Sequence, residues 1–171
     1  LLYHWNFPNE YNRLSVEKIK PELLEMEAYF NNLMLKGKKQ QPQQTTYIWQ
    51  NQPEKELPEL FILMVDKYKL IAPDTTLDQF KAIFTGQAVN TIKPVKWHNN
   101  NASELLYFII RLNDTSNIEK TNRLDYKKLT ACFIQPNGIP FKASFKELKQ
   151  NLSVNLSPDK QKAIDELVSN F

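Results

Sequence analysis

The sequence is poor in glycine and cysteine, and it contains no long apolar run. Its 3 glycines are too few for the tight turns of a β-sandwich or barrel, or for a glycine-rich phosphate loop. Its single cysteine, Cys132, cannot form an internal disulfide. We therefore expect a mainly α fold that is stable without disulfide bonds.

No apolar stretch reaches the roughly 18 residues that a transmembrane helix needs. The longest apolar runs, 60–65 and 105–110, have the length of buried core elements. The chain opens with Leu1 and not with Met, so we expect a trimmed or processed product. A soluble, cytoplasmic protein that does not enter a membrane is the expectation.

Residues that carry catalysis or bind metals are also scarce. The histidines are His4 and His98, and neither has a spacing to Cys132 that indicates a nucleophile with its base or a zinc site. Cys132 lies in the apolar run 129–134, which is typical of an inert core thiol. The sequence therefore predicts no enzyme, no metal site and no cofactor.

Apolar periodicity and turn residues divide the chain into two predicted parts. Residues 1–72 should form a helical N-terminal part with an exposed Gln- and Pro-rich loop at 37–53, and residues 73–171 a compact helical domain. In the first part, one helix is expected between Ser15 and Gly37, either starting or kinked at Pro21, and another after Pro58.

Within the predicted loop, an extended piece at 45–50 should pack Trp49 against the body of the protein.

In the second part, three helix-start signatures, each closed by Glu or Gln three residues later, begin at Thr76, Asn101 and Ser144. The helix after Asn101 is apolar on nearly every face, which predicts a central buried helix. Asn137-Gly138 is the strongest turn signal, and it predicts a small β-hairpin or wing.

Three lysines form the first candidate site. Lys142, Lys146 and Lys149 are spaced by four and three residues, so they share one face of the predicted helix 144–152. Lysines on such a face contact DNA phosphates without reading the base sequence. The alternative interpretation is an ordinary solvated helix surface.

Aromatic residues near the start of the chain form the second candidate site. Tyr3, Trp5 and Phe7 alternate with polar residues, so they predict an edge strand or an arm that binds a protein partner. We expect Trp97 to be a core residue and the neighbouring His98 to have a structural role. The alternative function is therefore a protein–protein interaction module.

The C-terminal half resembles a known family in three segments, which read IKPVKWHNNNASELLYFIIRL, CFIQPNGIPFKASFKELKQNLS and FKAIFTGQ. They are similar to the C-terminal domain of RteC-type regulators and related mobile-element proteins of Bacteroidetes. The resemblance implies a winged-helix-like, DNA-binding domain and a non-enzymatic accessory or regulatory role. The sequence departs from a helix-turn-helix, because about ten residues join the two helices where that motif has three or four.

Overall fold

The computed structural model describes residues 21, 24–30 and 44–171, and the chain divides into two compact units, Leu1–Pro42 and Gln43–Phe171. In the first unit, residues 21 and 24–30 are helical, and the rest of the predicted first helix lies outside the described residues. The second unit contains, in chain order, α2 (Pro53–Ile62), the π-helix η1 (Leu63–Lys67), α3 (Leu77–Ala82), β1 (Val95–Lys96), α4 (Ala102–Asp114), α5 (Tyr126–Cys132), β2 (Phe133–Ile134), α6 (Phe145–Gln150), α7 (Leu152–Asn155) and α8 (Pro158–Val168).

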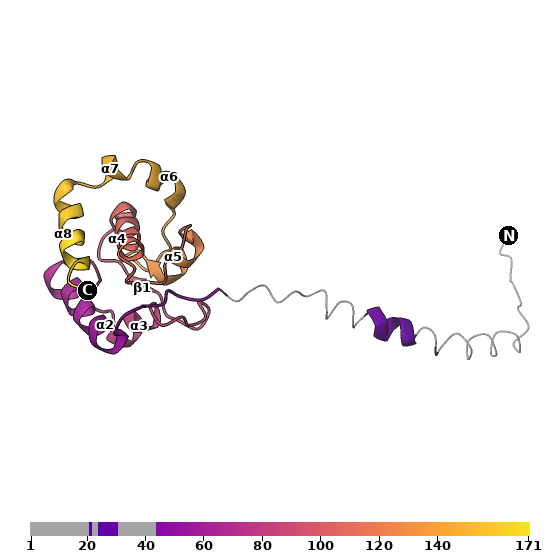
Figure 1. Cartoon of the computed structure of the whole chain (residues 1–171). Coiled ribbons are helices and arrows are strands. Elements are labelled where there is room, and N and C mark those ends of the chain that lie inside the picture. Colours follow the sequence, from indigo (N-terminus) through magenta and orange to yellow (C-terminus); the bar gives the residue numbers. More distant parts are fainter. Residues whose placement is uncertain (1–20, 22–23, 31–43) are drawn as a thin grey trace, which may run out of the picture. The chain divides into compact units, whose positions relative to one another are not determined.

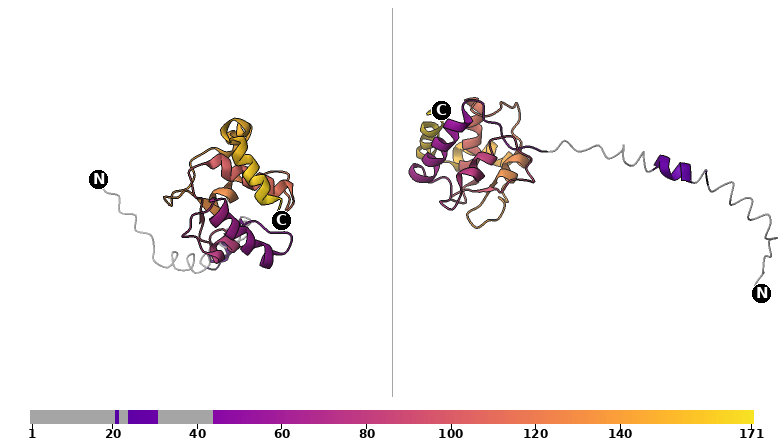
Figure 2. Two further views of the ribbon diagram at one scale, coloured as in Figure 1. Left: turned by 90° about the vertical axis from the view of Figure 1, so that its left-hand side faces the viewer. Right: turned by 90° about the horizontal axis from the view of Figure 1, so that it is seen from below.

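Helix α4 lies at the centre of the second unit. Figure 1 shows α5, α6, α7 and α8 arranged around it, with α2 and α3 below, and Figure 2 shows the same unit from two further sides. The apolar residues that α4 buries are Leu105, Leu106, Phe108, Ile109 and Leu112. The predicted mainly α fold with a central buried helix is confirmed. Of the helices in the described ranges, none is long and apolar enough to cross a membrane.

A short sheet joins two segments that are far apart in the chain. Strands β1 and β2 pair in parallel, with Val95 opposite Phe133 and Lys96 opposite Ile134. Directly after β1, the N–H of Trp97 donates to the carbonyl of Ile134 at 2.8 Å. Because β1 precedes α4 and β2 follows α5, this pairing fixes the start of α4 near the end of α5.

The predicted turn at Asn137-Gly138 is present. Gly138 has φ +81°, a left-handed conformation that glycine adopts without a steric penalty. One antiparallel bridge joins Ile134 to Pro140 across this turn. The predicted hairpin is therefore a single bridge, because β2 has its main partner in β1.

Within the predicted exposed loop at 37–53, residues 45, 48 and 50–52 are exposed and three others are buried. Thr46, Tyr47 and Trp49 are buried, and the N–H of Trp49 donates to the carbonyl of Phe84 at 2.9 Å. Thr46, Tyr47 and Trp49 therefore pack into the core from this segment, as predicted for Trp49.

Residues 53–67 belong to the same core as the C-terminal helices. Leu57, Leu60 and Met64 of α2 and η1 are fully buried in one cluster with the apolar residues of α4. The boundary between the two compact units therefore falls between Pro42 and Gln43, and not near residue 72 as we expected from the sequence.

Helix α2 begins earlier than the sequence predicts. Pro53 occupies its first turn, where the missing proline N–H leaves no hydrogen bond unmade, and Pro58 lies inside the helix. The helix then widens into η1, a π-helical segment of 5 residues. Pro58 was therefore a misleading start signal, because Pro53, five residues earlier, occupies the first turn of the helix.

Two of the three predicted helix-start signatures form as expected. The side chain of Thr76 and that of Gln79 make both bonds of a capping box. The side chain of Asn101 accepts from the N–H groups of Ser103 and Glu104. Ser144 makes no such side-chain bond, so the predicted capping box at α6 is wrong, and α6 begins through backbone bonds alone.

Candidate nucleic-acid interface

The predicted DNA-binding residues Lys142, Lys146 and Lys149 are all exposed. Helix α6 begins at Phe145, so Lys146 and Lys149 lie on the helix three positions apart, and Lys142 lies in the segment before it. The prediction of one helical stripe is corrected to this extent, because the helix is shorter than expected. In the described part of the chain, no carboxylate lies within ion-pairing distance of these three ammonium groups.

The apolar side of this segment anchors it to the core. Phe141 and Phe145 are 7% and 3% exposed, and their ring centroids lie 6.1 Å apart. Leu148 and Leu152 are half-buried and pack against the same core. These four side chains form an apolar row against the core, and they hold the neighbouring lysines at the surface.

The starts of α5 and α6 lie side by side, as Figure 1 also shows. The rings of Tyr126 and Phe145, the first residues of these helices, are stacked with centroids 6.4 Å apart and planes 13° from parallel. Residues 118–150 contain seven Lys and Arg against three Asp and Glu, a net charge of +4. We define the basic face by four exposed residues of these two helices and the segment before α6: Lys127, Lys142, Lys146 and Lys149.

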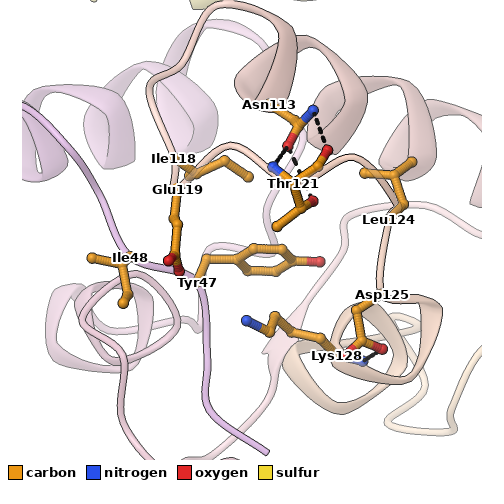
Figure 3. Close-up of a pocket in the computed structure, with 9 residues that line it drawn as sticks. All are labelled: Tyr47, Ile48, Asn113, Ile118, Glu119, Thr121, Leu124, Asp125 and Lys128. Carbon is orange, nitrogen blue, oxygen red and sulfur yellow. Dashed lines mark hydrogen bonds between the residues drawn. The ribbon is translucent and has the colours of Figure 1, made fainter.

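Polar contacts fix the first turn of α5, and Figure 3 shows the one between Asp125 and Lys128. The carboxylate of Asp125 accepts from the backbone N–H groups of Lys127 and Lys128. The ammonium of Lys128 donates to the carbonyl of Thr46 at 3.2 Å and lies 5.4 Å from the ring centroid of Tyr47. Lys128 is therefore engaged within the protein, whereas Lys127 is free to face solvent.

Beside these contacts lies a hollow of about 30 Å³, drawn in Figure 3. This volume holds one or two water molecules and no organic ligand. Burial raises the pKa of the Tyr47 phenol in its wall well above the ordinary value, so the ring stays neutral at physiological pH. The hollow is therefore part of the scaffold that holds α5 in place.

Glu104 is a buried carboxylate with three partners. Its Oε2 accepts from Trp97 Nε1 at 3.3 Å and from Asn99 Nδ2 at 2.6 Å. Its Oε1 lies 3.1 Å from Nζ of Lys160 in α8, and the Glu104 side chain is 5% exposed. From the sequence, Glu104 marks only a helix start. Lys160 lies far along the chain, and no local pattern connects the two.

The remaining sequence candidates lie apart from the basic face. Trp97 is fully buried, as predicted, and His98 is exposed. Cys132 is buried, as predicted, and burial raises the pKa of its thiol to about 12. The thiol is therefore protonated at neutral pH and is a poor nucleophile.

Tyr3, Trp5 and Phe7, the predicted partner-binding residues, lie outside the described residues. Across residues 44–171 and the described helical residues before them, no three His, Cys, Asp or Glu side chains gather in a way that could hold a metal ion. The candidate DNA-binding residues all lie in the second unit.

Comparisons with protein-family models, with curated proteins and with solved structures gave no match. The likeness to RteC-type regulators stays a hypothesis based on residues 80–87, 92–112 and 132–153.

Proposed function

We propose that this chain is a non-enzymatic accessory or regulatory protein whose basic face contacts the phosphates of duplex DNA. The observation that carries the proposal is the exposure of Lys142, Lys146 and Lys149 with no carboxylate partner among the described residues. Ammonium groups that are not neutralised by the protein attract phosphate and release the counterions condensed on DNA.

The distribution of charge on α6 supports this proposal. Glu147 is the acidic residue of this helix, and it follows Lys146 by one position. Successive helical residues point about 100° apart, so Glu147 is turned away from the line that joins Lys146 and Lys149. A phosphate that approaches the two lysines therefore meets little repulsion from this carboxylate.

Two further points bear on the proposed role: the family resemblance and the state of the Cys132 thiol. The resemblance to RteC-type regulators implies a DNA-binding role in mobile elements, and such a protein works in the cytoplasm. Burial raises the pKa of Cys132 to about 12, so the sole thiol of the chain is not suited to act as a nucleophile.

Lysine contacts to phosphate predict a binding constant that falls steeply with salt. We expect the log–log slope of binding against salt, measured with a labelled duplex from about 50 to 200 mM, to be negative. Replacing Lys142, Lys146 and Lys149 together with Gln should flatten this slope by about 2–3 units, since each neutralised phosphate contributes close to one. Random and selected duplexes should be weakened alike, because lysine does not read bases through phosphate.

A second triple variant provides the matched control. Replacing Lys55, Lys67 and Lys93 with Gln removes the same charge from exposed positions outside the basic face. This control should keep the slope of the wild type. Equal flattening in both triple variants would show that net charge, and not the basic face, governs binding. Absence of binding at the low-salt end would refute the proposed function.

A protein-interaction role is the second candidate function, and one observation favours it. In helical residues 24–30, the side chains of Met26, Tyr29 and Phe30 are 54%, 63% and 56% exposed. Apolar side chains gathered on one short helix are typical of helices that bind a partner. If the duplex does not bind at low salt, this candidate takes the place of the first.

A further inference from the structure

A second hollow, of about 290 Å³, lies between the start of α4, the start of α8 and the segment that follows η1. Its volume falls at the lower end of the range for small-molecule sites, so it suits a ligand of few atoms. We call this cavity the Glu104 hollow. The residues that line it are Tyr68, Lys69, Leu70, Asn99, Glu104, Asp159, Lys160, Ala163 and Ile164.

Other residues of the protein hold the Glu104 carboxylate in the wall of the hollow. Glu104 is held by Trp97 Nε1, Asn99 Nδ2 and Lys160 Nζ at 3.3, 2.6 and 3.1 Å. The charges of Glu104 and Lys160 therefore satisfy each other, and neither needs a ligand. A polar wall that is already held in place lowers the entropy cost of binding, because its side chains do not have to be ordered when a ligand binds.

Two exposed residues of opposite charge also line the hollow. Lys69 and Asp159 are both exposed, and in the described part of the chain neither has an opposite charge within ion-pairing distance. Lys69 also has φ +52°, a left-handed conformation that is uncommon for lysine. It follows the π-helix η1, and π-helical turns are frequent at functional sites.

This pair of charges selects the class of ligand. A simple anion would meet Lys69 but also the carboxylate of Asp159, and a simple cation would meet Asp159 but also Lys69. A zwitterion satisfies both, and the apolar residues Leu70, Ala163 and Ile164 supply a wall for an aliphatic group. We propose that the Glu104 hollow binds a free α-amino acid, with its carboxylate at Lys69 and its ammonium at Asp159.

Proton–nitrogen NMR spectra of the full chain, titrated with glycine, L-alanine, L-valine and L-leucine, test this proposal. At least one of these should give saturable shifts of amides around the hollow with a Kd of about 1 mM or tighter, as a ligand of this size allows. Isobutylamine and isovalerate each carry one of the two charges of valine. We expect both to bind at least about tenfold more weakly, because each leaves one rim charge unmatched.

Two variants locate the contacts. Lys69→Asn removes the ammonium and keeps a residue type that tolerates a positive φ, and Asp159→Asn removes the carboxylate. Each should weaken amino-acid binding at least about tenfold, since each loses a charge-assisted hydrogen bond. Lys162→Asn and Glu166→Gln are matched controls on α8 that do not line the hollow, and they should bind as the wild type does.

The proposal is overturned if none of the four amino acids gives saturable shifts around the hollow. It is equally overturned if isobutylamine or isovalerate binds as tightly as valine, or if Lys69→Asn and Asp159→Asn retain wild-type affinity. The spectrum of each variant without ligand shows that its fold is intact, so a loss of binding is assigned to the missing charge.

Discussion

Replacement of Glu104 with Gln tests how the start of α4 is held. The carboxylate accepts from Trp97 and Asn99 and pairs with Lys160, and its side chain is 5% exposed. Gln has one acceptor oxygen instead of two and turns an amide donor toward a group that is itself a donor. Two charge-assisted bonds become neutral, at about 1 kcal/mol each, and the half-exposed pair with Lys160 loses about 0.2–1 kcal/mol. We expect the free energy of unfolding to fall by about 2–3 kcal/mol.

The assay is urea unfolding followed by circular dichroism. With an m-value of about 1–3 kcal/mol/M, the expected loss lowers the midpoint by roughly 0.7–3 M while m stays the same. A double-mutant cycle with Lys160→Met separates the ion pair, whose coupling should be below about 1 kcal/mol because Lys160 is 44% exposed. Lys162→Met, on the exposed side of α8, is the control. A change below about 0.5 kcal/mol for Glu104→Gln would refute the described network.

Three further predictions concern the core and its titration. Leu105→Ala and Ile109→Ala, in the buried helix α4, should each lower the free energy of unfolding by about 2–5 kcal/mol in urea, whereas Ile139→Ala at the exposed turn should change it by less than about 0.5 kcal/mol. Losses below about 1 kcal/mol at both α4 sites would contradict the assignment of α4 to the core. Burial raises the pKa of Cys132 to about 12 and that of Tyr47 well above 10.0, so the unfolded chain releases protons that the folded chain keeps. Stability should therefore be full below about pH 9 and fall as the pH rises further, and Cys132→Ala should make that fall shallower.

Local signals in the sequence predicted the helical class well. The capping box of Thr76 and Gln79 and the cap of Asn101 formed, because each needs only residues within one turn. The apolar run after Asn101 predicted the buried helix α4, because a helix with apolar residues on every face has no side suited to water. At Ser144 the same kind of pattern failed, since a capping side chain also depends on how the segment before it approaches.

Features built from distant segments could not be predicted. Nothing in the sequence near Val95 or Phe133 specifies that they pair, because strand pairing depends on how α4 and α5 pack. The partners of Glu104 come from a loop and from α8, so no local pattern predicts them. For the basic face, Lys142, Lys146 and Lys149 were predicted, whereas the nearness of the start of α5 to that of α6 appears only in the stacking of Tyr126 on Phe145.

Mapping of the DNA contact surface tests the central claim most directly. In an NMR titration of the full chain with a duplex of about 16 base pairs at about 50 mM salt, amide shifts should change for residues 120–128 and 141–150. Residues 53–67 of α2 and η1 should keep their shifts, because they lie outside the basic face. Shift changes centred on α2 and η1, or no change anywhere, would contradict the claim that the basic face binds DNA.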